Sequence, residues 1–159
     1  MSSTRPTLNW KDPVHLLAFG LGSGAAPKAP GTFGTLAAIP LYLLVSDLSP
    51  GFYVLLLALM FVMGIWLCQR TSDDLGVHDH GGIVWDEWVG FLLTMFNAPA
   101  GWLWIVIGFL LFRLFDILKP WPINWLDRKV SGGLGIMLDD ILAGVYAWIG
   151  LQLSFVLIG

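Results

Sequence analysis

Three long stretches of this chain contain no Asp, Glu, Lys or Arg, and they constrain the fold more than any other feature. They cover residues 48–69, 88–112 and 141–159. At a helical rise of about 1.5 Å per residue, apolar segments of this length can cross most of the hydrocarbon core of a bilayer. The acidic residues are concentrated between these stretches, which predicts that they lie in short loops and at helix ends near the membrane surface.

The composition agrees with an integral membrane protein of one domain, residues 1–159. Hydrophobic residues make up 57% of the chain and charged residues only 12%, which is unusual for a soluble domain. A net charge of -3, with no basic tract longer than Arg128 and Lys129, argues against nucleic acid as a partner. The single cysteine, Cys68, excludes an internal disulfide and a cysteine-based metal cluster. The sequence leaves the oligomeric state open.

We predict an all-α fold, a polytopic membrane bundle of about five apolar helices. The helices are expected over residues 32–46, 52–68, 83–96, 102–118 and 139–158, with a kink at Pro40. With five spans and a cytoplasmic amino terminus, every Lys and Arg faces the cytoplasm, as the positive-inside rule requires. The same arrangement places every acidic residue except Asp47 on that face. The first and third segments are short for full spans, so tilted or partly embedded helices are the alternative.

Two pairs of adjacent carboxylates are the strongest candidates for a functional site. Asp86 and Glu87 open one predicted helix, and Asp139 and Asp140 open the last one. Charges at the end of a membrane helix are costly unless they are hydrated, paired or bound to an ion. Because all-oxygen ligands select a hard cation, we predict that these four residues hold Mg²⁺ at the cytoplasmic face. The alternative for each pair is a capping role at the positive end of the helix dipole.

Further candidates lie between the two pairs. Lys119 is a candidate for catalysis and phosphate binding, and Arg128 is a second candidate for phosphate binding. Asp79, His80 and Asp116 are candidates for catalysis, with Asp79 or His80 supplying the proton for the leaving group. Two alternatives stay open: a solvated loop position for the histidine, and a simple ion pair between Asp116 and the arginine three residues before it.

A glycine-rich segment, residues 20–35, precedes the first long helix. The backbone N–H groups of such a loop can bind an anion, and Ser23 and Thr32 are therefore candidate substrate-binding residues. The segment lacks the lysine of a nucleotide-binding P-loop. The alternative is a turn whose glycines let helices pack closely.

Several short motifs are spread over nearly the whole chain. They are PGTFGT at residues 30–35, GVHDHG at 76–81, VWDE at 84–87, KPWP at 119–122 and GIMLDDI at 135–141. Together they resemble the phosphatidylglycerophosphatase A family. The resemblance implies a helical, multi-pass, Mg²⁺-dependent phosphatase of the bacterial inner membrane with its active site facing the cytoplasm. Its expected partner is a phospholipid in the bilayer, phosphatidylglycerophosphate, which it converts to phosphatidylglycerol and inorganic phosphate.

Other phosphatase chemistries lack their residues in this chain. Cys68 is followed too soon by Arg70 for a cysteine-phosphatase loop, and no Asp-x-Asp-x-Thr nucleophile motif occurs. Metal-assisted attack by water therefore remains. The alternative functions are a Mg²⁺-dependent phosphatase of broader lipid specificity, a small ion or proton transporter, and a non-catalytic scaffold. A transporter should carry charges in the middle of its spans, and the predicted spans carry none there.

Overall fold

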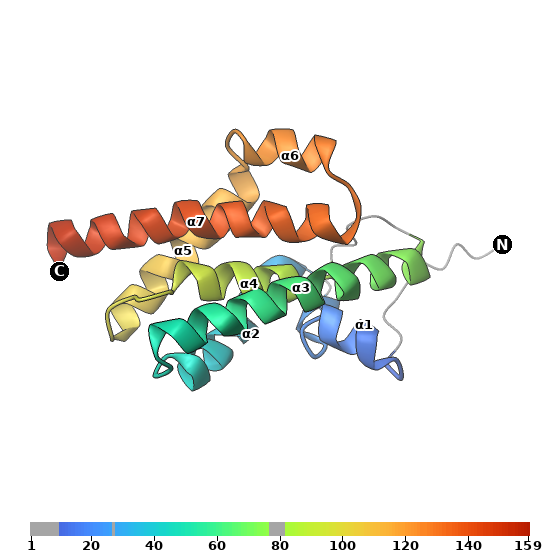
Figure 1. Cartoon of the computed structure of the whole chain (residues 1–159), viewed down its shortest axis with the longest axis horizontal. Helices are drawn as coiled ribbons and strands as arrows, with labels where there is room; N and C mark the ends of the chain where they lie inside the picture. The colour runs from blue at the N-terminus through green and yellow to red at the C-terminus, as the bar shows by residue number, and fades with distance from the viewer. Residues whose placement is uncertain (1–9, 27, 77–81) are drawn as a thin grey trace.

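A computed structural model describes residues 10–26, 28–76 and 82–159, and these ranges contain helices and no strand. In chain order the elements are α1 (Pro13–Ala18), the 3₁₀ helix η1 (Ser23–Ala25), α2 (Pro30–Val45), α3 (Pro50–Leu75), α4 (Trp85–Thr94), α5 (Trp102–Leu118), α6 (Ile123–Lys129) and α7 (Gly132–Ile158) (Figure 1). The predicted all-α class is confirmed.

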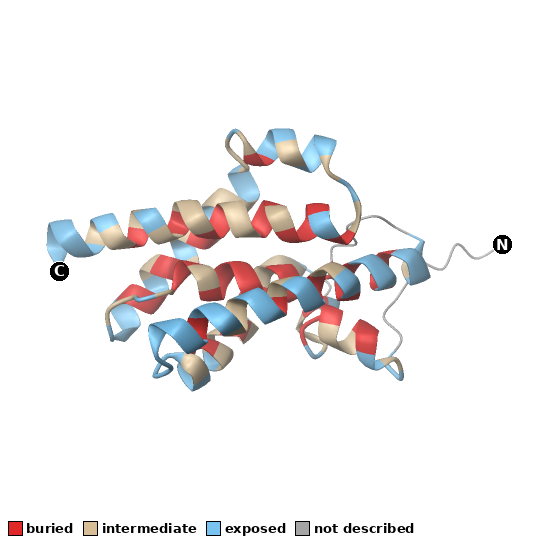
Figure 2. Cartoon of the chain, viewed as in Figure 1, coloured by how far each residue is buried: buried red, intermediate tan, exposed pale blue. Residues whose placement is uncertain are grey.

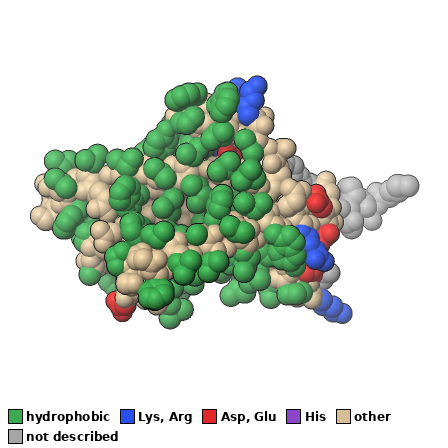
Figure 3. All heavy atoms as spheres, in the orientation of Figure 1, with side chains coloured by type: hydrophobic (Ala, Val, Ile, Leu, Met, Phe, Trp, Pro, Cys, Tyr) green, Lys and Arg blue, Asp and Glu red, His purple; other side chains and the backbone are tan. Residues whose placement is uncertain are grey.

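The two longest helices, α3 and α7, run side by side in opposite directions (Figure 1). Both are long and apolar enough to cross a membrane, with 26 and 27 residues. Only 28% and 22% of their most apolar windows are buried, so most of their apolar surface faces outward, unlike that of a helix in a soluble core. Hydrophobic side chains accordingly cover much of the face formed by these helices (Figure 3).

The central helix is α4, which packs against α2, α3, α5 and α7. All of its residues are buried except Glu87 and Leu93, which are half-buried (Figure 2). It crosses α7 at two glycines: a Cβ on Gly144 would lie 2.7 Å from the carbonyl oxygen of Gly90. Because this distance is too short for a real side chain, glycine at position 144 allows the two backbones to approach closely.

The five predicted segments correspond to α2, α3, α4, α5 and α7, but five membrane spans are not confirmed. The bounds of α5 agree with the prediction. Helices α2, α4 and α5 have 16, 10 and 17 residues, fewer than the roughly 20 residues of a typical span. Two bounds differ most, by seven residues each: α3 continues to Leu75 and not only to Cys68, and α7 begins at Gly132 and not at Asp139. The first turns of α7 are stabilised by tertiary packing, since Gly133 lies directly against the backbone of Ile65 in α3.

Candidate active site

Asp86, Glu87 and Asp140 form the centre of the candidate site. One carboxylate oxygen from each residue lies within 4.8 Å of the others, close enough to hold a metal ion. The first two residues belong to the first turn of α4, whereas Asp140 lies well inside α7. We call these three residues the acidic group. The close crossing of α4 and α7 brings them together.

Asp140 is the most buried member of the acidic group, with 2% of its surface exposed. Its carboxyl group contacts those of Asp86 and Asp116, and its Oδ1 atom makes no hydrogen bond within the described part of the chain. Carboxylates at this distance repel one another unless a proton or a cation lies between them, and a buried charge without a partner is costly. The arrangement therefore fits a hard cation that prefers oxygen ligands.

Helix α5 adds an arginine and a fourth carboxylate to one side of the acidic group. Nη1 of Arg113 donates a hydrogen bond to Oδ2 of Asp116, so the ion pair given above as an alternative is confirmed. The same nitrogen lies 3.8 Å from Oε1 of Glu87. The two partners from α5 are only 16% and 12% exposed, so solvent screens their charges weakly. The three-residue spacing signalled the pair in the sequence, but nothing there indicated that the arginine also faces α4.

The start of α2 lies against this ion pair. A Cβ on Gly31 would lie 2.9 Å from Oε1 of Glu87 and 3.1 Å from Nη1 of Arg113. Because real side chains do not tolerate the shorter of these distances, glycine lets the first turn of α2 approach the site. Thr32, a predicted substrate-binding residue, follows in the same turn and is half-buried.

Asp139 has different surroundings from its neighbour in the chain. Its Oδ2 atom lies 3.7 Å from Nζ of Lys119, which in turn lies 3.6 Å from Oδ1 of Asp127. Consecutive helical side chains point about 100° apart, so Asp139 and Asp140 face different elements. Three of the four predicted metal ligands thus come together in the acidic group, and a ligand role for Asp139 stays a prediction.

The remaining predicted residues either make hydrogen bonds to their own loop or helix or lie outside the described residues. Oγ of Ser23 donates to the carbonyl of Gly20 in its own loop, at 2.9 Å. Nε of Arg128 donates to a backbone carbonyl of α6, at 3.3 Å, on the exposed side of that helix. Asp79 and His80 lie outside the residues that the structure describes.

Comparison with known proteins places the chain in a family. Residues 16–155 match the family described as phosphatidylglycerophosphatase A. The chain belongs to this family. The phosphatidylglycerophosphatase A of Escherichia coli (strain K12) is 51% identical over 139 residues, which cover 87% of this chain and 81% of the relative. The Haemophilus influenzae protein of the same name is 51% identical over 138 residues, covering 86% and 85%. No solved structure matches the chain.

In this member of the phosphatidylglycerophosphatase A family, the two acidic pairs lie at different depths in their helices. The N-cap positions of α4 and α7 are Val84 and Ser131, and neither makes a side-chain capping hydrogen bond. The pair in α4 still lies in the first turn, where the helix dipole favours negative charge. The pair in α7 lies beyond the first turn, so the capping alternative is wrong for it.

The glycine-rich segment of this family member supports the start of α4. The carbonyl of Ala18 accepts a hydrogen bond from the N–H of Val84, at 2.8 Å. A Cβ on Gly20 or Gly34 would collide with the side chain of the same valine, and one on Gly24 would collide with the carbonyl of Gly82. The close-packing alternative is therefore confirmed, whereas anion binding by this segment stays a prediction.

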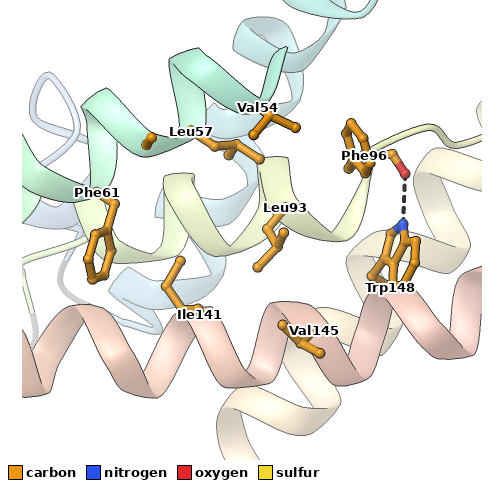
Figure 4. A pocket seen from close by; sticks show the side chains of 9 residues that line it. Val54, Leu57, Phe61, Leu93, Phe96, Ile141, Val145 and Trp148 are labelled. Atoms are coloured by element: carbon orange, nitrogen blue, oxygen red, sulfur yellow. Dashed lines mark hydrogen bonds between the residues drawn. The ribbon is translucent and has the colours of Figure 1, made fainter. Parts of the chain in front are cut away.

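An apolar groove of about 540 Å³ lies between α3, α4 and α7 (Figure 4), and its lining includes no member of the acidic group. It is lined by Val54, Leu57, Ala58, Phe61, Leu93, Phe96, Ile141, Val145 and Trp148. The α7 residues of the lining recur at helical spacing on a stripe that does not include Asp140. The acidic group instead lies where α4 and α7 meet the α5 side, so the groove holds none of the candidate chemistry of this family member.

Proposed function

We propose that this chain is a membrane phosphatase that hydrolyses phosphatidylglycerophosphate to phosphatidylglycerol and inorganic phosphate. Membership of the phosphatidylglycerophosphatase A family and the names of the relatives support this reaction. The observation that carries the proposal is the buried acidic group, with Arg113 beside Glu87 and with Lys119 paired to Asp139, the neighbour of Asp140 in the chain. A phosphate monoester hydrolyses extremely slowly in water, and carboxylates that bind a metal next to cationic side chains supply what its hydrolysis needs.

The proposed cofactor is Mg²⁺, held by Asp86, Glu87 and Asp140. When bound, this ion neutralises phosphoryl oxygens and lowers the pKa of an attacking water. Asp116, whose carboxyl group contacts that of Asp140, has the proposed role of general base. Asp139, the fourth predicted ligand, has the proposed role of holding Lys119 at the site.

Two basic residues serve the substrate in this proposal. Lys119 stabilises the negative charge that spreads over the phosphoryl oxygens during transfer. Its ammonium group is held by ion pairs with Asp127 and Asp139. Arg128, exposed on α6, binds the head group of the lipid farther out. Asp79 or His80 donates the proton to the leaving glycerol oxygen, and Ser23 and Thr32 are the proposed contacts on the glycine-rich side.

The depth of the acidic group fits a substrate that stays in a bilayer. The backbone N–H of Gly133 donates to Oε1 of Gln69, at 2.8 Å, so these residues lie at the same level of α7 and α3. Asp140 follows seven positions later, about 10 Å deeper along α7. At that depth α3 presents the exposed side chains of Val62 and Met63. We infer that the head group enters from the polar end of the two helices while the acyl chains remain in the membrane.

The proposed location is the bacterial inner membrane, with several spans and the site facing the cytoplasm. Support comes from the two helices that are apolar enough to span, the bacterial relatives, and the distribution of Lys and Arg along the sequence. Helices α2, α4 and α5 would then be tilted or partly embedded between the two long helices.

The test is phosphate release by the purified full chain in phospholipid vesicles. Phosphatidylglycerophosphate and phosphatidic acid are compared, each with Mg²⁺ and with a chelator. We expect release from the first substrate, its loss with chelator and its recovery with added Mg²⁺. Glu87→Gln should lower the rate about 100-fold with unchanged helical circular dichroism, while the matched change Asp47→Asn, on an exposed residue far along the chain from the site, should not. Full activity of Glu87→Gln contradicts the metal assignment, and equal rates on both lipids favour the broader phosphatase.

A further inference from the structure

Arg113 has hydrogen-bonding capacity that its ion pairs do not use. A guanidinium group presents five N–H donors in a rigid planar fork. The ion pairs with Asp116 and Glu87 both involve Nη1. Nε is buried and makes no hydrogen bond within the described residues. Within this part of the chain Nε therefore has a donor to spare, on the edge of the fork that it shares with Nη2.

This edge of the fork lies at the start of α2. Nη2 of Arg113 would be 3.2 Å from a Cβ on Gly31, and a side chain at position 31 would crowd it. A buried N–H group without an acceptor is costly, so a structural arginine would be expected to satisfy it with a neighbouring carbonyl. Two oxygens of a phosphate group match the Nε–Nη2 edge with two parallel hydrogen bonds.

The charge around the arginine favours the same ligand. The three carboxylates of the acidic group lie within 4.8 Å of one another, and Asp116 contacts one of them, Asp140. Together they would repel a dianionic phosphate. A cation fixed among them offsets part of this repulsion and lies where charge develops on the transferring group. The ion pairs of Arg113 hold its guanidinium in that place before substrate arrives.

We propose that Arg113 is a catalytic residue that binds the phosphoryl group of the substrate through Nε and Nη2, while Nη1 remains on Asp116. The inference rests on the proposed function. It gives Arg113, which lies beside Glu87, a bidentate contact with the phosphoryl group, a role that the proposal gives to neither Lys119 nor Arg128. A lysine at this position keeps the charge and the pair with Asp116 but cannot form the two parallel bonds.

The experiment compares Arg113→Lys and Arg113→Gln with the unaltered protein. The readouts are kcat and KM, inhibition by inorganic phosphate, the melting temperature, and Mg²⁺ binding measured by calorimetry without substrate. We expect Arg113→Lys to keep its melting temperature and Mg²⁺ affinity while kcat/KM falls about 100-fold and inhibition by phosphate weakens about 10-fold. Arg113→Gln should lose more. Arg70→Lys is the matched control, because Arg70 also pairs with an aspartate, at 3.8 Å, but is half exposed.

Two results overturn the proposal. One is an Arg113→Lys protein with the kcat/KM and phosphate inhibition of the unaltered chain. The other is a loss of Mg²⁺ affinity as large as the loss of activity, which makes the arginine a positioning residue for Glu87 and Asp116. If the unaltered protein releases no phosphate from any lipid, the proposed function fails instead, and direct calorimetric binding of inorganic phosphate to the two proteins still tests the arginine.

Discussion

Both acidic pairs are two adjacent carboxylates in the sequence, but they have different surroundings in the structure. Asp86 and Glu87 both belong to the acidic group. Helix α4 packs against α2, α5 and α7, so both side chains point toward neighbouring helices. Asp139 and Asp140 separate: the second joins the acidic group, and the first contacts Lys119 after the end of α5. Adjacent carboxylates on a helix point about 100° apart, so they share one site only where neighbouring elements surround both side chains.

The largest effect should come from removing the α7 member of the acidic group. Asp140→Asn takes a charge away from the most buried position, and we expect phosphate release to fall on the order of 1000-fold. Mg²⁺ binding by calorimetry should be lost with it. Circular dichroism should be unchanged, because a neutral side chain at this position relieves repulsion among the carboxylates. Retained metal binding would remove Asp140 from the ligand set.

A substitution of Asp139 tests whether the two carboxylates of α7 have separate roles. Asp139→Asn leaves the acidic group intact and removes one ion-pair partner of Lys119, so we expect a loss of about 10-fold in activity with Mg²⁺ affinity near that of the unaltered protein. The comparison fails if Asp139→Asn loses metal binding as completely as Asp140→Asn. Asp139 would then be a ligand, as the sequence predicts.

The smallest effect is expected at the outer partner of the same lysine. Asp127 is 39% exposed and lies 3.6 Å from Nζ of Lys119, and exposed ion pairs contribute little. Asp127→Asn should change kcat/KM by no more than about 2-fold at physiological salt. Activity measured over a range of salt concentrations checks this, since a larger loss that persists at high salt would show that Asp127 and not Asp139 holds the lysine.

Local patterns predicted the helices well where apolar residues are continuous. The bounds of α5 agree, and α2 and α4 differ from the predicted segments by only a few residues. The start of α7 was missed because residues 132–138 are rich in glycine, which disfavours a helix in isolation. The contact of Gly133 with the backbone of Ile65 stabilises that turn, and no local pattern contains this contact.

The site was predicted in part for a related reason. The carboxylates could be named because charges are rare in an apolar chain and their placement is costly. The position of Arg113 could not be predicted, since an arginine three residues before an aspartate also describes an ordinary surface pair. Only the packing of α5 beside α4 and the start of α2 shows that its guanidinium faces Glu87 and Gly31.

By itself the sequence determined the helical class, the apolar segments and the family, because hydrophobicity and short motifs are properties of neighbouring residues. The tertiary structure decided which side chains share a site. Asp140, Asp86 and Asp116 are far apart in the chain and meet only where α4, α5 and α7 pack together. The physical reason is geometric. Adjacent side chains on a helix point in different directions, and the packing of neighbouring helices determines which residues each side chain contacts.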